Sequence, residues 1–219
     1  ELTPAQKTKI DSNVAAAIER IKGFQTGQGG FSYWPNDRIE NPWASIYATH
    51  FLWYAQNKGY AINNGMLQNS LENIKKAASQ THNLENDYYH QNIQAYRLYL
   101  LALTKQPDMG SMNRLKELNL TVSAKIKLGL AYIHAGKKDV AKTILDPTQM
   151  VISPYYDGYS SYSSDLLDHT YLLEAYSLMG DVLNVQKEVK FITNQLNSNR
   201  FLGTQNTAMA LRVMSEYVV

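Results

Sequence analysis

Apolar residues recur at helical spacing along almost the whole chain, and runs that alternate with a period of two are rare. Strand signals are therefore weak, and the pattern predicts an all-α protein. The first helix is expected to begin at Pro4 and to end before Gly23. Further helices are expected over 42–58, 66–80, 87–105, 109–117, 121–135, 138–146, 164–179, 181–198 and 204–218.

The starts of the first two helices carry clear capping signals. Thr3 is a candidate N-cap with Pro4 at the first helical position. Asn41 and Pro42 repeat this arrangement, and Gly59 is the expected stop of the second helix. The loop between the two helices is therefore expected to begin at Gly23 and to end at Asn41.

Two kinds of helix alternate along the chain. The helices over 42–58, 87–105, 121–135, 164–179 and 204–218 are apolar nearly all round, which predicts that each is covered on every side. The helices between them, such as the one containing "NVQKEVKFITNQ", have one apolar stripe and one charged face. The alternation therefore predicts an inner layer of buried helices and an outer layer of amphipathic ones.

An internal echo supports helical hairpins. The segments "LGLAYIHAGKKDVAKTIL" and "LLEAYSLMGDVLNVQKEV" share Leu, Ala-Tyr and a Gly at which the helix stops, at Gly136 and at Gly180. The offset, 180 − 136 = 44 residues, is a helix-hairpin period. Hairpins whose alternate helices are buried form either an open solenoid or a closed α/α toroid.

In a toroid, the loops before the inner helices gather on one face. The two longest of these loops are rich in glycine and aromatic residues: "TGQGGFSYWPNDRIEN" and "PTQMVISPYYDGYSSYSS". Helix N-termini also present free N–H groups and a positive dipole end. The functional face, if the domain has one, is expected to be this rim.

Composition excludes several functions. The net charge is +2, from 21 basic and 19 acidic residues that are scattered along the chain, so no basic stripe indicates nucleic-acid binding. No apolar run reaches membrane-spanning length. The absence of cysteine removes disulfides, thiolate metal sites and cysteine nucleophiles. The chain begins at Glu1 with a helix-start pattern, and we interpret it as a segment of something longer.

Several motifs in order resemble those of one family. The stretch "FQTGQGGFSYWPNDRIENPWASIYATHFLWYAQNKGY" resembles the segment that follows the thioester motif of bacterial alpha-2-macroglobulins. The resemblance continues through "QAYRLYLLALTKQPDMGSMNRLKE", "SAKIKLGLAYIHAGKKDVAKTIL" and "SSDLLDHTYLLEAYSLMGD". It closes with "FLGTQNTAMALRVMSEY", which is similar to the Gly-Ser-Thr-Gln-x-x-Ala ending of that domain. It covers essentially the whole chain.

The resemblance implies an α/α toroid, a six-hairpin barrel like those of terpenoid cyclases and prenyltransferases. Residues 1–219 would form a single domain, most of the thioester, complement-like domain of a large protease-trapping protein. About five hairpins are counted here, so the sixth, whose inner helix carries the Cys-Gly-Glu-Gln motif, would lie upstream. An exposed groove, lined by helices 42–58 and 204–218, is expected where it is missing.

The same resemblance implies the partners and the compartment. The partners would be the proteases that the parent protein traps and other domains of the same chain, with no nucleic acid and no cofactor. An extracytoplasmic location is implied, in the periplasm, in the cell envelope or secreted, and membrane anchoring is expected only through the parent's N-terminus. These expectations rest on the resemblance alone.

The chain departs from the family pattern in ways that matter for chemistry. Without cysteine, this segment cannot contain the thioester. Some complement-type domains have a His after Gly-Gly-Phe that takes over the thioester carbonyl, but no His stands between Phe31 and Trp43 here. No catalytic residue is therefore assigned, and the segment is not expected to be an enzyme.

The candidate site residues are those of the rim next to the expected thioester. A dry lining would protect an acyl thioester from water. The structural alternative is that the glycines permit a tight turn and the rings plug one end of the toroid. Thr204 and Gln205 read first as an N-cap and a first helical residue. The full set is Gly29, Gly30, Phe31, Tyr33, Trp34, Thr204 and Gln205.

The histidines are interpreted as structural. His50 is expected to be a hydrogen-bonded core residue, and His169 a polar partner beside Asp168. His82 and His90 flank Asp87, but a metal site needs three or four ligands at matched spacing, so none is assigned. The tyrosine- and serine-rich stretch at 153–165, with a turn at Asp157–Gly158, could contact a carbohydrate or a partner protein, or simply fold over the rim.

Two other functions remain open on residue patterns alone. One is an α/α-barrel enzyme that acts on carbohydrate or isoprenoid; Asp37, Glu40, Asp157 and Asp165 are the rim carboxylates that a glycosidase would use. The other is a tetratricopeptide-like scaffold, although the 44-residue offset exceeds the 34-residue period of such repeats.

Overall fold

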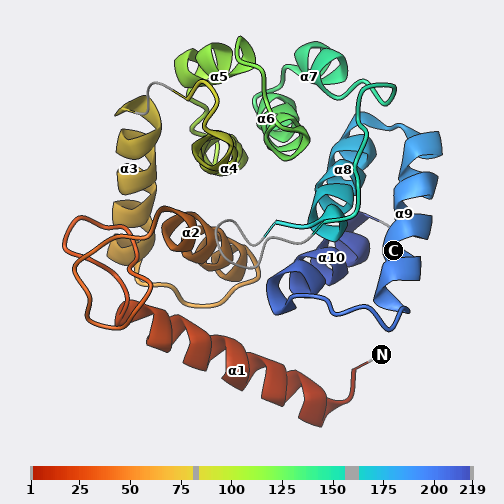
Figure 1. Ribbon diagram of the computed structural model, residues 1–219. Coiled ribbons are helices and arrows are strands. Elements are labelled where there is room, and N and C mark those ends of the chain that lie inside the picture. Colours follow the sequence, from red (N-terminus) through yellow and green to blue (C-terminus); the bar gives the residue numbers. More distant parts are fainter. Residues whose placement is uncertain (1, 81–83, 156–162, 218–219) are drawn as a thin grey trace. The chain divides into compact units, whose positions relative to one another are not determined.

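The computed structural model describes residues 2–80, 84–155 and 163–217. The chain divides into two compact units, Glu1–Gln80 and Thr81–Val219, which are described separately; the assignment of 1–219 to a single domain stays a prediction. Figure 1 labels the helices. They are α1 (Pro4–Lys22), α2 (Pro42–Asn57), α3 (Asn64–Gln80), α4 (Tyr88–Leu103), α5 (Met109–Lys116), α6 (Val122–His134), α7 (Lys138–Ile144), α8 (Asp165–Met179), α9 (Val182–Leu196) and α10 (Thr204–Tyr217).

The helices begin where the capping signals place them. Thr3 caps α1 in a capping box with Gln6, and Pro4 occupies its first turn. Asn41 caps α2, with its side-chain oxygen 2.8 Å from the backbone N of Ala44. Every regular element among the described residues is a helix, and extended pairing there is limited to isolated bridges, so the all-α expectation is confirmed.

The first unit has its own small apolar core. Helices α1, α2 and α3 meet there, and the long loop between α1 and α2 contributes the buried ring of Phe31 and the partly buried ring of Phe24. The buried members of this cluster are Ile18, Phe31, Leu52, Ala55, Ile62, Met66 and Leu67. The loop is therefore fixed to the unit by the same burial that holds its helices together.

The second unit has the predicted layers. Most residues of α4, α6 and α8 are buried, and these helices pack in the order α4, α6, α8, α10. Helices α5, α7 and α9 each pack against an inner helix (Figure 1). Most of their charged residues are exposed. The alternation of apolar and amphipathic helices is thus confirmed for this unit.

Burial on every side is confirmed only for α4, α6 and α8. In α2 and α10 many residues remain half-buried, and Leu211 of α10 is exposed, so that expectation was wrong for these two helices. The physical reason for α10 is that it stands at the end of the row of inner helices in its unit and packs mainly on α8. Helix α2 has only α1 and α3 beside it in its unit, so part of its surface stays uncovered there. The groove expected between α2 and α10 would join different units and stays a prediction.

The internal echo is visible in the backbone. Gly136 and Gly180 follow α6 and α8, and both have a φ of 76°. The left-handed conformation at a helix end costs less free energy for glycine than for other residues. This explains why a glycine follows the first helix of both hairpins.

Candidate functional site

The loop between α1 and α2 is held in shape by the carboxylate of Glu40. Its Oε1 accepts hydrogen bonds from the Thr26 hydroxyl at 2.7 Å and from the Gly30 N–H at 3.1 Å. Both carboxylate oxygens also accept from the side-chain amide of Asn73 on α3, at 3.1 and 3.0 Å. This carboxylate therefore closes the loop on itself and ties it to a helix.

The glycine pair of the loop is required by close packing. Gly29 has a φ of 92°, and a Cβ added there would lie 2.4 Å from the carbonyl oxygen of Asn69 on α3. A Cβ at Gly30 would lie 2.5 Å from the carboxyl carbon of Glu40. Neither distance is possible without movement of the neighbouring atoms, so the tight-turn interpretation of this pair is supported.

Of the three aromatic residues of the loop that were predicted as site residues, one is buried and two are exposed. Phe31 is 1% exposed, and its backbone N–H donates to the Ser45 hydroxyl at 2.7 Å. Tyr33 and Trp34 are 48% and 67% exposed and pack edge to face, with their centroids 5.3 Å apart. Phe31 therefore belongs to the core of its unit, whereas the backbone turns the other two rings out of that core. The interpretation that the rings plug one end of the toroid involves both units and stays a prediction.

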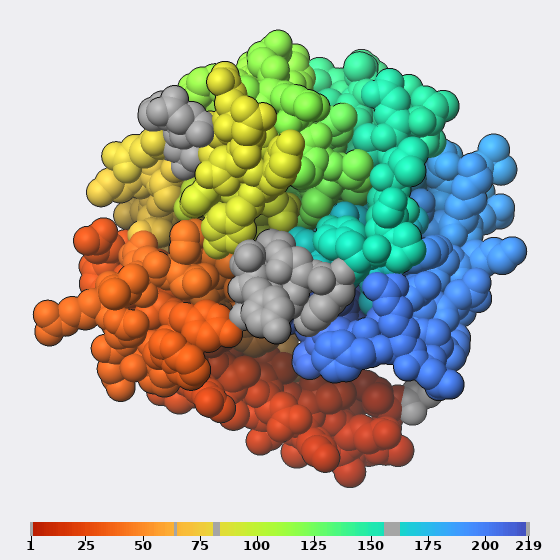
Figure 2. Space-filling view, in the orientation of Figure 1, coloured from red at the N-terminus to blue at the C-terminus, as the bar shows by residue number. Residues whose placement is uncertain are grey.

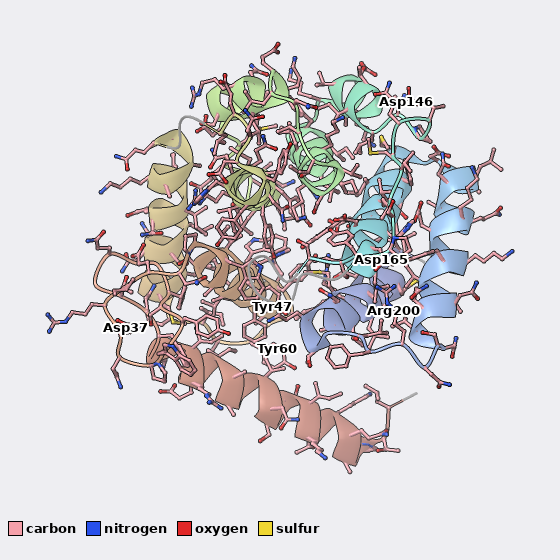
Figure 3. The ribbon with its side chains drawn as sticks, viewed as in Figure 1. Asp37, Tyr47, Tyr60, Asp146, Asp165 and Arg200 are labelled. Carbon is pink, nitrogen blue, oxygen red and sulfur yellow. The ribbon has the colours of Figure 1, made fainter. Side chains whose placement is uncertain are left out.

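Residues 33–39 of this loop lie mostly at the surface. Figure 2 shows them in orange, with side chains that project outward, and Figure 3 places Asp37 at the outside of the loop. The Asp37 carboxylate accepts from the backbone N–H groups of Arg38 and Ile39, so it stabilises its own turn. Oδ1 of Asp37 and both oxygens of Glu40, two of the carboxylates considered for a glycosidase, are thus engaged in holding the loop.

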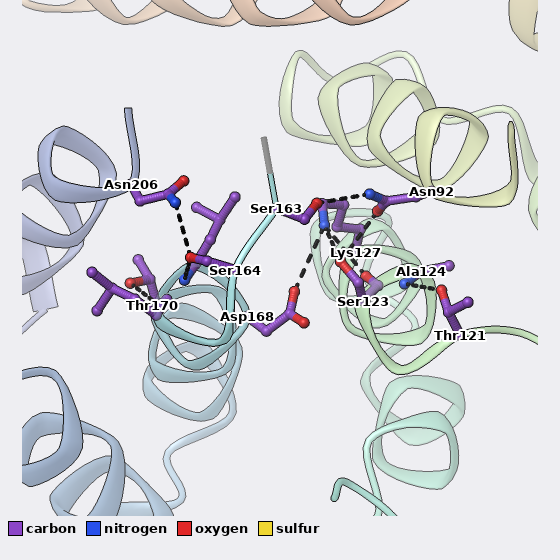
Figure 4. Close-up of polar contacts among 12 residues, drawn as sticks. Asn92, Thr121, Ser123, Ala124, Lys127, Ser163, Ser164, Asp168, Thr170 and Asn206 are labelled. Atoms are coloured by element: carbon purple, nitrogen blue, oxygen red, sulfur yellow. Dashed lines mark hydrogen bonds and ion pairs between the residues drawn. The ribbon is translucent and has the colours of Figure 1, made fainter. Parts of the chain in front are cut away.

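In the second unit, the N-terminal ends of four helices are joined by side-chain hydrogen bonds (Figure 4). The Asn92 amide of α4 donates to the Ser163 hydroxyl at 3.0 Å, and the Ser123 hydroxyl of α6 donates to the Asn92 carbonyl oxygen at 3.3 Å. The Asn206 amide of α10 donates to the Ser164 hydroxyl, the cap of α8, at 2.9 Å. The predicted gathering of inner-helix N-termini is therefore confirmed within this unit. We call these five residues the polar row.

A buried charged pair lies directly behind the polar row. Lys127 Nζ is 2.7 Å from the Ser123 hydroxyl and 4.0 Å from Asp168 Oδ1, and both charged side chains are almost fully buried. The Tyr155 hydroxyl donates to Asp168 Oδ2 at 2.7 Å. Burial lowers the pKa of Lys127 to about 8 although Asp168 opposes the shift, and burial raises the pKa of Asp168 against the pull of Lys127.

The remaining predicted site residues lie at the start of α10. Thr204 is exposed and Gln205 half-buried, next to Asn206 of the polar row. The cap was placed one residue too late, because Thr204 is already helical and the Gly203 carbonyl accepts the first helical bond, from the Thr207 N–H at 3.0 Å. The loop residues Gly29, Gly30, Phe31, Tyr33 and Trp34 belong to the other unit, so their proximity to this end stays a prediction.

The described residues on either side of 156–162 lie at the same end of the helices, and the interpretation that the whole stretch 153–165 folds over the rim stays a prediction. The Tyr155 carbonyl accepts hydrogen bonds from the Asp165 N–H and from Arg200, which also forms an ion pair of 2.7 Å with the Asp165 carboxylate (Figure 3). Only Oδ2 of Asp165 is paired in this way, while its Oδ1 is buried without a hydrogen-bond partner among the described residues. The turn at Asp157–Gly158 lies outside the described residues.

A second buried ion pair holds the inner layer together at Glu174, which has no exposed surface. Its carboxylate accepts from the Tyr99 hydroxyl at 2.6 Å and from Arg212 Nη2 at 2.8 Å, and His134 Nε2 lies 3.6 Å away. These residues come from α4, α10, α6 and α8. Burial alone would raise the pKa of Glu174, but Arg212 and the hydrogen bonds outweigh it and lower the pKa to about 2.

Glu174 should make stability depend on acid pH. Its pKa falls from 4.5 to about 2 on folding, so the unfolded chain binds more protons between these pH values. The contribution, about 3 kcal/mol, is complete above the unfolded pKa and is lost as the pH falls through the folded one. In urea unfolding, the stability difference between wild type and Glu174→Gln should shrink across this window. A difference that does not change with pH would contradict the assignment.

The described histidines have structural neighbours. His169 Nδ1 lies 2.6 Å from Glu188 on α9, so its partner is Glu188, and the expected pairing with Asp168 was wrong because Asp168 faces Tyr155. His90 Nδ1 lies 2.6 Å from Asp87, the cap of α4, and His50 is buried in α2. His82 lies outside the described residues. Among the described side chains, no group of three or more His, Cys, Asp and Glu could hold a metal ion.

Sequence reasoning missed the polar row and the charged pair. The available signal was polar residues inside otherwise apolar helices, such as Lys127 in "SAKIKLGLAYI" and Asn92 in "HQNIQAY". A buried polar residue requires a partner. The partners lie 31 to 71 residues away along the chain, and only the fold brings them together.

The fold and the joined helix ends define an all-α protein of helical hairpins, of the α/α-toroid class. Comparison with solved structures shows where this fold recurs. The chain superimposes on native alpha-2-macroglobulin of Escherichia coli with a TM-score of 0.79 and 18% identity, over 98% of this chain and 14% of that one. For Salmonella alpha-2-macroglobulin reacted with methylamine the TM-score is 0.78 at 21% identity, over 100% of this chain and 15% of that one.

The sequence itself is 27% identical, over 140 residues, to an alpha-2-macroglobulin of Xylella fastidiosa. The match covers 62% of this chain and 8% of that protein, so this chain spans a small part of the length of its relatives. No family model matches the chain. The resemblance to bacterial alpha-2-macroglobulins is therefore confirmed as a similarity of sequence and of fold. Within the described residues, no helix combines the length and the apolar character that a membrane span requires.

Proposed function

We propose that this chain is part of a macroglobulin-like protease trap, an endopeptidase inhibitor. In this proposal it forms the helical domain that houses and shields a thioester, while another segment of the same protein supplies the reactive bond. The observation that carries the proposal is the match of the whole chain to Salmonella alpha-2-macroglobulin reacted with methylamine. Methylamine is a nucleophile of the kind that opens an acyl thioester.

The shielding role gives the rim a physical task. An acyl thioester survives only while water is kept away from it. The loop carrying Gly29, Gly30 and Phe31 is fixed by Glu40 and by the apolar core of its unit, which supports a rigid wall rather than a mobile lid. The exposed rings of Tyr33 and Trp34 and the exposed start of α10 at Thr204 are then surfaces for the neighbouring thioester segment.

The segment performs no catalysis in this proposal. The described carboxylates that a glycosidase would use are engaged: Glu40 ties the loop together and Asp165 pairs with Arg200. The partners are the trapped proteases and other domains of the same protein, in an extracytoplasmic compartment. Solved structures of related E. coli proteins are described as activated by trypsin and by porcine elastase, which supports proteases as the partner class.

A trapping assay tests this function. The full-length protein is mixed with trypsin or elastase, and cleavage of a large protein substrate is compared with cleavage of a small chromogenic peptide. A trap encloses the protease without blocking its active site, so protein cleavage should fall while peptide cleavage continues. Loss of both activities would indicate an active-site inhibitor, and unchanged cleavage of both would remove the proposal.

A further inference from the structure

The second unit contains a cavity of about 530 Å³ next to the polar row. This volume lies in the range of small-molecule sites. Its walls are apolar and aromatic, with Tyr88 and Tyr89 from the start of α4, Val122 from α6 and Ile152 from the loop before α8. Its polar surface comes from the helix ends, among them Asn92, Ser123 and Ser163, and from Asp168.

One buried acceptor among the residues that line this cavity has no hydrogen-bond partner in the described part of the chain. Asp168 is 1% exposed, and its Oδ2 accepts from Tyr155. No donor among the described residues forms a hydrogen bond with Oδ1. Lys127 Nζ lies 4.0 Å from Oδ1 and donates instead to the Ser123 hydroxyl, at 2.7 Å. An ionised buried oxygen left without a donor costs free energy, so a ligand with an N–H or O–H group would be favoured there.

The charge balance of the cavity restricts the chemistry of that ligand. With both side chains ionised, Lys127 and Asp168 together carry no net charge. An ammonium group placed at Oδ1 would stand beside the Lys127 ammonium, and a carboxylate or phosphate would stand beside Asp168. A neutral hydroxyl group meets neither repulsion and can both donate to Asp168 and accept from a neighbouring donor.

We propose that this cavity binds a neutral saccharide, with a sugar hydroxyl donating to Asp168 Oδ1 and the sugar ring packed against the tyrosine walls. A pyranose has an apolar C–H face that suits the rings of Tyr88 and Tyr89, and hydroxyl groups at its edge that suit Asn92, Ser123 and Ser163. The site lies within one unit and does not depend on the proposed trapping function.

Saturation-transfer difference NMR on the whole protein tests the proposal with matched probes. N-acetylglucosamine and glucose are the neutral probes, glucosamine in weakly acidic buffer is the cationic one, and glucuronate is the anionic one. The neutral sugars should receive saturation at millimolar concentration and the charged sugars little. No transfer to either neutral sugar, or stronger transfer to glucosamine than to N-acetylglucosamine, would overturn the proposal.

Variants locate the binding. Asp168→Asn removes the ionised acceptor and should weaken neutral-sugar binding about tenfold or more, the size of one hydrogen bond to a charged group. Tyr88→Ala removes a ring that is 58% exposed, so it should lose sugar signal without loss of fold. Asp139→Asn, on the exposed face of α7, is the control and should bind like wild type.

Circular dichroism decides how the variants are interpreted. If Asp168→Asn does not fold, the sugar signal of Tyr88→Ala alone shows whether the sugar binds in this cavity. Undiminished sugar signal in the folded variants would show that the sugar binds elsewhere, and would overturn the assignment of this cavity.

Discussion

Replacing Arg212 with methionine is expected to lower the free energy of unfolding of the second unit by about 3–5 kcal/mol, the usual cost of removing one partner of a buried ion pair. Arg212 Nη2 lies 2.8 Å from the Glu174 carboxylate, which has no exposed surface. Methionine keeps much of the side-chain volume but leaves this carboxylate without its cation. Tyr99 alone cannot compensate, because one hydroxyl donor replaces neither the charge nor the second hydrogen bond.

Urea unfolding followed by near-ultraviolet circular dichroism measures the effect. Arg114→Met on α5 is the matched control: Arg114 is exposed and its guanidinium donates to the Ser111 hydroxyl, so the change should stay within about 0.5 kcal/mol. Equal effects of the two substitutions would mean that the Glu174 cluster does not hold the inner layer together.

Replacing Gly29 with alanine is expected to destabilise the first unit by about 2–4 kcal/mol, since strain at a positive φ adds to overpacking. The φ of 92° is unfavourable for alanine, and the new Cβ would lie 2.4 Å from the Asn69 carbonyl oxygen. The loop must then move away from α3, which also weakens the hydrogen bonds of Gln25 to the Gly29 and Met66 carbonyls. In the full-length protein, the proposed shield would loosen at the same position.

Gly27 provides the control within the same loop. A Cβ added there meets no heavy atom within 4 Å, so Gly27→Ala should change stability by less than about 0.5 kcal/mol. Thermal unfolding of both variants measures the difference. A Gly29→Ala protein as stable as Gly27→Ala would show that the loop does not pack against α3 as described.

The helices could be predicted from the sequence because their signals are local. Capping residues such as Thr3 and Asn41, and stop glycines such as Gly136 and Gly180, act within one or two turns. The layers followed from how far around each helix the apolar surface extends. The burial of α2 and α10 was overestimated because apolar composition shows what a helix can bury and does not show how many neighbours cover it.

The candidate site was less predictable because its contacts are long-range. The glycine pair was recognisable from the sequence, but the role of Glu40 depends on a helix 33 residues further on. Tyr33 and Trp34 look like core residues in the sequence and are exposed in the structure. The pairing of Lys127 with Asp168 needs two inner helices side by side, which no local pattern specifies.

The most direct test of the shielding claim is mass spectrometry of the full-length protein before and after methylamine treatment. The amine nitrogen attacks the thioester carbonyl, the carbon–sulfur bond breaks, and the sulfur leaves as a thiol. The account predicts that the native protein gains the mass of one methylamine and one titratable thiol. An unchanged mass and an unchanged thiol count would contradict it, because there would be no reactive bond for this helical domain to shield.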